Sequence, residues 1–89
     1  MIDAAQIRAA RGLLAISQLD LAEIAGVHVA TIRRLEAATG VRGAAETLVK
    51  MQKALEEAGI EFIPAEEGKG PGVRLRHEEP SAPERRRRS

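Results

Sequence analysis

The stretch SQLDLAEIAGVHVATIRRLE, residues 17–36, decides the fold of this 89-residue chain. Ser17 and Asp20 have the spacing of a capping box, in which two side chains satisfy backbone N–H groups at the start of a helix. Gly26 predicts the end of that helix, because glycine enters a left-handed turn without a Cβ penalty. We predict that a second helix begins at once and covers about residues 28–38.

The second helix has a buried side and an outward side when its residues are placed at 100° intervals. Ile32 and Leu35 fall on the buried side. The outward side carries Val29, Ala30, Arg33 and Arg34. Two arginines with little bulk around them suit a helix that enters the major groove of DNA, where guanidinium groups bind phosphates and guanine edges. On these residues alone, a solvated face with two ordinary arginines remains the alternative.

The small, glycine and apolar residues of the stretch fall at the same positions as in a known motif. They are Gln18, Leu21-Ala22, Gly26-Val27, Thr31-Ile32 and Leu35-Glu36. Over about residues 5–58 this order resembles the helix-turn-helix of phage-repressor and Cro-type proteins, the xenobiotic-response-element family. The resemblance implies a compact lambda-repressor-like bundle of four to five helices, with helix 28–38 in the major groove of double-stranded DNA. His28 departs from the pattern, since Ser or Thr usually caps this helix.

The resemblance also implies which residues touch DNA: Gln18, His28, Val29, Ala30, Arg33, Arg34 and Arg42. Gln18 would reach a phosphate at the positive end of the first helix of the motif, with a solvated side chain as the alternative. Arg42 would touch the backbone from the loop AATGVRG, residues 37–43, or stand in solvent. Relatives read bases at the position of Arg34, so we predict that Arg34 specifies the sequence and Arg33 mainly anchors a phosphate.

One structural ion pair follows from the same resemblance. Relatives pair an arginine seven residues before Gln18, here Arg11, with the glutamate that ends the recognition helix, here Glu36. Such a pair would lock the first helix of the chain to the recognition helix. A phosphate contact is the alternative role for Arg11.

Two further helices and two strands are expected. Asp3 and Gln6 form a second capping-box pattern before a helix over 4–14. Leu48, Met51, Leu55 and Ala58 have helical spacing within a helix over 44–58. Residues 60–64 and 72–76 are short strands by composition and alternation, joined by a loop over 65–71 that is longer than a tight hairpin. We therefore predict a mainly α fold with a short C-terminal β-hairpin.

The chain is expected to divide into three parts. Residues 1–58 form the helix-turn-helix domain, residues 59–76 the hairpin extension, and residues 77–89 a disordered, charged tail. An isolated hairpin is marginal in water, so we expect it to pack on the helices or to join two copies in a homodimer. In the tail, Arg85 to Arg88 are either a phosphate tether or a solubilising end.

Composition limits the classes of protein to which the chain can belong. With one aromatic residue, Phe62, the core must consist of aliphatic side chains, which suit helix packing. The chain has no cysteine, so it has no disulfide or thiolate metal site. No apolar run is long enough for a membrane span, and we expect a soluble cytoplasmic protein. The net charge of +1 does not favour nucleic acid by itself.

No pattern in the sequence supports catalysis, a metal or a cofactor. His28 and His77 are far apart and lack acidic or thiol neighbours at ligand spacing. The glycines at 68, 70 and 72 lack the strand–loop–helix context of a phosphate-binding loop. The leading hypothesis is a sequence-specific DNA-binding transcription regulator. The alternative is an antitoxin-like module that engages a partner protein through its C-terminal extension; RNA binding is less favoured because no aromatic platform exists to stack bases.

Overall fold

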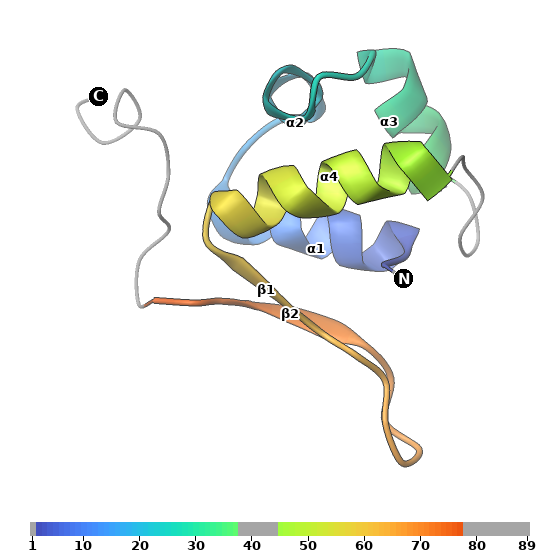
Figure 1. Cartoon of the computed structure of the whole chain (residues 1–89), viewed down its shortest axis with the longest axis vertical. Coiled ribbons are helices and arrows are strands. Elements are labelled where there is room, and N and C mark those ends of the chain that lie inside the picture. Colours follow the sequence, from blue (N-terminus) through green and yellow to red (C-terminus); the bar gives the residue numbers. More distant parts are fainter. Residues whose placement is uncertain (1, 38–44, 78–89) are drawn as a thin grey trace.

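A computed structural model describes residues 2–37 and 45–77. These residues form four helices and two antiparallel strands (Figure 1): α1 (Ala4–Leu14), α2 (Gln18–Ala25), α3 (Val29–Ala37), α4 (Ala45–Glu57), β1 (Ile60–Ile63) and β2 (Gly72–Leu75). The prediction of a mainly α fold with a short C-terminal hairpin is confirmed. Where the structure describes them, the boundaries agree with the expected ones to within a residue. The expected helix end at residue 38 and helix start at residue 44 lie outside the described residues.

Both predicted capping boxes are present. At the start of α1, Gln6 N donates to Asp3 Oδ1 at 2.9 Å and Asp3 N donates to Gln6 Oε1 at 3.0 Å. At the start of α2, Ser17 and Asp20 exchange the same two bonds at 2.9 and 3.0 Å. Each box satisfies backbone donors that have no partner within the helix, so the starts of α1 and α2 are fixed locally.

The two helices end in left-handed residues. Gly26 ends α2 with φ of 73°, as its position in the sequence predicts. Ala15 ends α1 with φ of 58°, although alanine has a Cβ that makes this region unfavourable. Nothing in the local sequence marks Ala15 for this role. Backbone hydrogen bonds close the turn: the N–H of Ala15 donates to the carbonyl of Gly12 at 3.2 Å, and that of Ile16 to the carbonyl of Arg11 at 3.1 Å.

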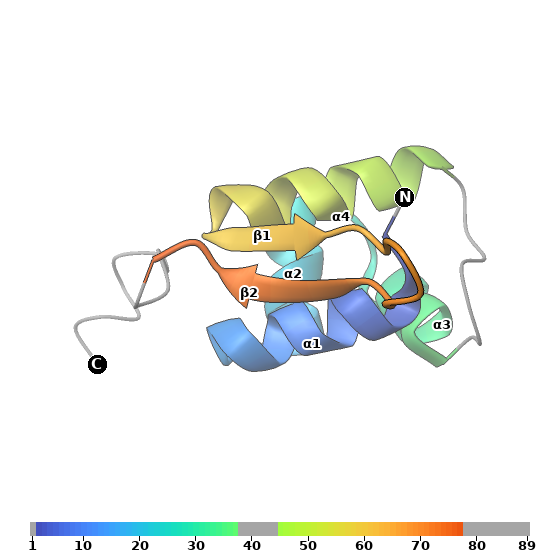
Figure 2. The ribbon, with the colours of Figure 1, turned by 90° about the horizontal axis from the view of Figure 1, so that it is seen from below.

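The helices and the hairpin are arranged in three layers. Figure 1 shows α2 and α3 on one side, α1 and α4 in the middle, and the hairpin on the opposite side. Figure 2, which looks onto the hairpin, shows β1 running alongside α4 and β2 alongside α1, with α2 and α3 behind. The core between the layers is aliphatic, as predicted; its fully buried members are Ile7, Leu14, Leu21, Ile32, Leu48, Met51, Leu55 and Ile60. None of the described helices is both long and apolar enough to cross a membrane.

Side chains anchor the hairpin to the helices. Phe62, Val73 and Leu75 pack against the core, and Gln6 Nε2 of α1 donates to the carbonyl of Gly72 at 3.0 Å. The guanidinium of Arg76 donates to the carbonyl of Glu56 in the last turn of α4. A two-stranded sheet needs such support, because it is marginally stable alone.

The tip of the hairpin is tighter than the sequence predicts. Glu66 and Lys69 exchange backbone hydrogen bonds of 3.0 and 2.8 Å beyond the end of the named strands. Glu67 and Gly68 between them both have positive φ, 42° and 80°. This is the geometry of a two-residue hairpin turn, so the expected long loop over 65–71 contains a tight turn of its own.

Candidate nucleic-acid interface

The turn between α2 and α3 is held by backbone hydrogen bonds. The N–H groups of Gly26 and Val27 both donate to the carbonyl of Ala22, at 2.9 and 3.0 Å. The carbonyl of His28 accepts from the N–H of Thr31 at 3.0 Å and from that of Ile32 at 3.4 Å. His28 therefore occupies the capping position of α3, and its side chain is exposed at the start of that helix.

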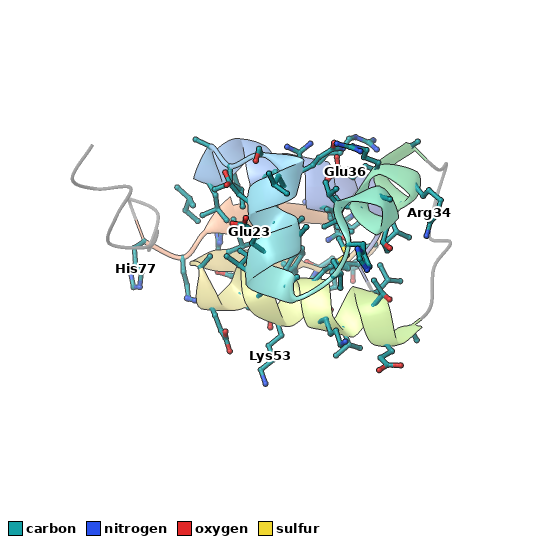
Figure 3. The ribbon with its side chains drawn as sticks, turned by 90° about the horizontal axis from the view of Figure 1, so that it is seen from above. Glu23, Arg34, Glu36, Lys53 and His77 are labelled. Atoms are coloured by element: carbon teal, nitrogen blue, oxygen red, sulfur yellow. The ribbon has the colours of Figure 1, made fainter. Side chains whose placement is uncertain are left out.

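The outward side of α3 carries the two arginines. Ala30, Arg33 and Arg34 are exposed, and Figure 3 shows Arg34 extending from α3 away from α2. Ile32 and Leu35 are buried, as the helical angles predict. Val29 is half-buried and packs against the core, so less of it reaches the outward surface than was expected. The helical angle placed Val29 on the outward side, but contact with the core covers part of its side chain.

Glu36 is buried on the side of α3 that faces α1 (Figure 3). Its carboxylate receives two hydrogen bonds from the guanidinium of Arg11, from Nε to Oε2 at 2.7 Å and from Nη2 to Oε1 at 2.7 Å. The side chains are 4% exposed for Glu36 and 21% exposed for Arg11. The structure therefore brings together the two residues that the family resemblance pairs, in the planar two-bond geometry that an arginine makes with a carboxylate.

The two charges shift each other's pKa. Burial by itself would raise the pKa of Glu36, but hydrogen bonds from Arg11 and Gln18 and the positive charges of Arg11 and Arg8 outweigh that cost, so the pKa lies below its ordinary value. The hydrogen bond to Glu36 raises the pKa of Arg11 against the smaller cost of burial. Both groups are consequently ionised at neutral pH.

A second arginine of α1 also holds α3. Arg8 Nη1 donates to the backbone carbonyl of Glu36, in the last turn of α3. Carbonyls at the end of a helix lack partners within it, and a cation beside them is favourable. The role of Arg8 was not predicted, although its spacing of three residues from Arg11 places both on one part of the helix surface.

Gln18 lies beside the C-terminal half of α3. Its Nε2 donates to Glu36 Oε1 at 3.2 Å, and its side chain is half-buried at the first residue of α2. This contact was also missed, because it joins residues 18 positions apart and depends on how α2 and α3 pack. The amide is thus held by the same carboxylate that binds Arg11.

The exposed charges of α3 are both positive. Figure 3 shows Glu23, the exposed acid of α2, on the side of that helix away from Arg34. Glu36 is neutralised by Arg11, which leaves Arg33 and Arg34 as the charges of the exposed side of α3. Such a surface attracts an anionic partner.

Some of the predicted residues lie outside the described part of the chain. Arg42, Arg85 and the arginines that follow it belong to residues 38–44 and 78–89, so their predicted contacts with phosphates stay predictions. Within residues 2–37 and 45–77, no three His, Asp or Glu side chains come close enough to hold a metal ion.

Comparison with known proteins matches this region of the chain. A protein-family model described as Helix-turn-helix matches residues 7–58, which is more than half of the chain. The match begins within α1, includes α2, α3 and α4, and ends before β1. No curated protein matches the chain.

Proposed function

This chain belongs to the Cro/C1-type helix-turn-helix family of DNA-binding proteins, and from that premise we propose that it is a sequence-specific transcriptional regulator. The recognition helix in this proposal is α3, which enters the major groove of double-stranded DNA. DNA binding is the general activity of the family. The proposed addition is that the residues of this chain read one operator sequence.

A single arrangement carries the proposal: α3 is fixed on one side and basic on the other. Arg11 binds the carboxylate of Glu36 and Arg8 binds its carbonyl, so the inner side of α3 is tied to α1. The outer side exposes Arg33 and Arg34. A helix that is already positioned loses little conformational entropy on binding, which favours the ordered contacts that specificity requires.

The residues are proposed to divide between anchoring and reading. Arg34 reads a guanine through O6 and N7, and Arg33 binds a phosphate. Gln18 and Arg42 add phosphate contacts. The side chains at the start of α3 contribute less specific contacts: His28 a hydrogen bond, and Val29 and Ala30 apolar contact with thymine methyl groups.

The proposal includes a homodimer. One recognition helix covers a short half-site, whereas two copies would read half-sites about 34–36 Å apart. The antiparallel register pairs Glu61 with Arg74 and leaves an outer edge on each strand of the hairpin. Free strand edges favour pairing with a further strand, which supports the hairpin as the contact between copies.

A partner protein is the second candidate, as in an antitoxin-like module. The observation that favours it is an open groove of about 480 Å³ beside the hairpin, lined also by residues of α1 and α4. The hairpin itself lies on the face opposite α2 and α3 (Figure 1). The groove is lined by Ile2, Gln6, Gln52, Phe62, Ile63, Pro64, Ala65 and Pro71. A segment bound there would leave α3 accessible to DNA.

The test of the leading proposal is binding to a pool of random duplexes, followed by selection of the bound fragments. The parent protein should enrich one motif, and its affinity should fall steeply with salt as condensed counterions are released. The variant Arg33→Ala/Arg34→Ala should lose both properties. Lys53→Ala is the matched control, because Lys53 is an exposed cation on α4 that points away from α2 and α3 (Figure 3). A folded parent that binds no duplex at low salt would contradict the proposal.

A further inference from the structure

One oxygen of Glu36 accepts hydrogen bonds from two side chains. Arg11 Nη2 donates to Oε1 at 2.7 Å and Gln18 Nε2 donates to the same atom at 3.2 Å. An ionised carboxylate can only accept, so the atom of the Gln18 amide that faces it must be the nitrogen. The Glu36 carboxylate thus fixes the orientation of the Gln18 amide. The amide of a glutamine in solvent has no such constraint.

The orientation decides what Gln18 can offer to DNA. Its Nε2 carries two N–H groups, and the bond to Glu36 occupies one of them. The other remains a donor at the first residue of α2, next to the positive end of that helix. An amide turned the other way would present a carbonyl oxygen, whose lone pairs a phosphate repels.

We propose that Glu36 is a positioning residue, which holds the Gln18 amide so that its second N–H donates to a phosphate oxygen of the DNA backbone. The inference rests on the proposed DNA binding and deepens it. Glu36 does not touch DNA: it acts through Gln18 on the phosphate and through Arg11 on α1. One buried carboxylate therefore fixes both the recognition helix and a backbone contact at the start of the neighbouring helix.

The composition of the chain makes the proposal directly observable. The chain contains three glutamines, Gln6, Gln18 and Gln52, and no asparagine, so a nitrogen–proton spectrum contains three side-chain amide pairs. On titration with the selected duplex, one proton of the Gln18 pair should shift strongly while the proton bonded to Glu36 stays nearly in place. Gln52, which donates to Glu56 Oε2 at 3.0 Å on α4, is the internal control and should not shift. Equal shifts of both Gln18 protons, or none, would overturn the proposal.

Affinities of a double-mutant cycle provide the functional test. Gln18→Met keeps the length of the side chain and removes its N–H groups, and it should weaken binding to the duplex about fivefold. Because the amide is neutral, the slope of affinity against salt should not change, unlike that of Arg33→Ala. In the Glu36→Gln background the new amide can either donate or accept, so Gln18 is no longer oriented. There, Gln18→Met should weaken binding less than about twofold.

The outcomes separate this inference from the proposed function. Absence of duplex binding by the parent would reject the function. Parent binding with the same Gln18→Met effect in both backgrounds would reject the role of Glu36 alone. If Glu36→Gln does not fold, the variant Gln18→Asn decides instead. The asparagine amide is one methylene too short to reach Glu36, so this variant should bind the duplex as weakly as Gln18→Met. Parent-like affinity of Gln18→Asn would overturn the proposal. Gln52→Ala, which removes a glutamine–glutamate bond of the same kind from α4, should bind like the parent.

Discussion

Arg11 of α1 and Glu36 of α3 form a two-bond ion pair across the helical bundle, and the carboxylate within it is almost completely buried. The pair joins residues 25 positions apart and is the main polar link between the first helix and the proposed recognition helix. Its partners cannot be removed one at a time without leaving a charge in a partly buried place.

Glu36→Ala should lower both the stability of the protein and its affinity for DNA. The guanidinium of Arg11 would lose both of its bonds to the carboxylate, and breaking a buried pair costs about 3 kcal/mol. Thermal and urea denaturation measure the loss. The control is Glu61→Ala, which breaks the exposed ion pair with Arg74 on the hairpin and should cost less than about 1 kcal/mol. Equal effects of the two variants would show that burial does not strengthen the Arg11–Glu36 pair.

The stability of the protein should decrease in acid, in part because of Glu36. The pKa of this carboxyl is lowered in the folded protein, so near that pKa the unfolded chain binds a proton that the folded chain does not. The contribution of Glu36 is therefore complete above the pKa of the unfolded carboxyl, about 4.3, and is lost as the pH falls through the lower folded value. Urea denaturation from pH 7 to pH 3 should give a flatter curve for Glu36→Gln than for the parent. Parallel curves would contradict the assignment.

Arg33 and Arg34 should have different effects when they are replaced. Arg34→Ala should cost about 1–3 kcal/mol and relax the preference at one base pair, as expected for loss of a two-bond contact with guanine. Arg33→Ala should weaken binding to all sequences alike and reduce the salt slope by about one unit. Selection of DNA sites with each variant, side by side with the parent, distinguishes these results. If Arg33→Ala loses a base preference and Arg34→Ala keeps all of them, the two roles are reversed.

The protein is expected to form a homodimer, at least on DNA. Light scattering over a range of concentrations, with and without the selected duplex, measures the mass directly. Two copies on one duplex should place their half-sites about one helical turn apart, because both recognition helices must face the same side of the DNA. A monomeric mass at high concentration in both conditions would reject the dimer and favour the partner-protein alternative.

Gln6→Glu should destabilise the hairpin, although glutamate is the more usual capping-box residue at this position. The carboxylate can still accept from the N–H of Asp3, but it replaces the Nε2 that donates to the carbonyl of Gly72. Two acceptors would then face each other in a buried place, at a cost of about 1–3 kcal/mol. Hydrogen exchange of the β2 amides would reveal the loosening, with Gln52→Glu as the control. Unchanged protection of β2 would show that the bond to Gly72 is dispensable.

The parts of the fold that follow local rules were predictable from the sequence. The capping boxes at Asp3 and Ser17, the stop at Gly26 and the buried face with Ile32 and Leu35 all depend on residues within one or two turns of each other. Periodicity likewise located α4 and alternation located the strands. In each case the signal and the structure that it specifies lie in the same short segment.

The remaining features have no local signal in the sequence. The left-handed turn at Ala15, the bond from Gln6 to Gly72 and the bond from Gln18 to Glu36 involve either an unmarked residue or residues distant in sequence. The Arg11–Glu36 pair is also distant, and only its likeness to a known family made it predictable. Val29 is an intermediate case. Its helical angle predicted the outward side of α3, but contact with the core covers part of its side chain.

The layered arrangement makes the two faces of this protein available for separate tasks. Because the hairpin tip and α3 lie on opposite sides of the α1–α4 layer (Figure 1), a label attached at Lys69 on the tip would stand away from a duplex bound to α3. A dye or a tether at that position would therefore report on the bound protein without touching its operator. In the proposed function, the same geometry would allow a cargo joined to the hairpin to be carried to DNA without covering α3.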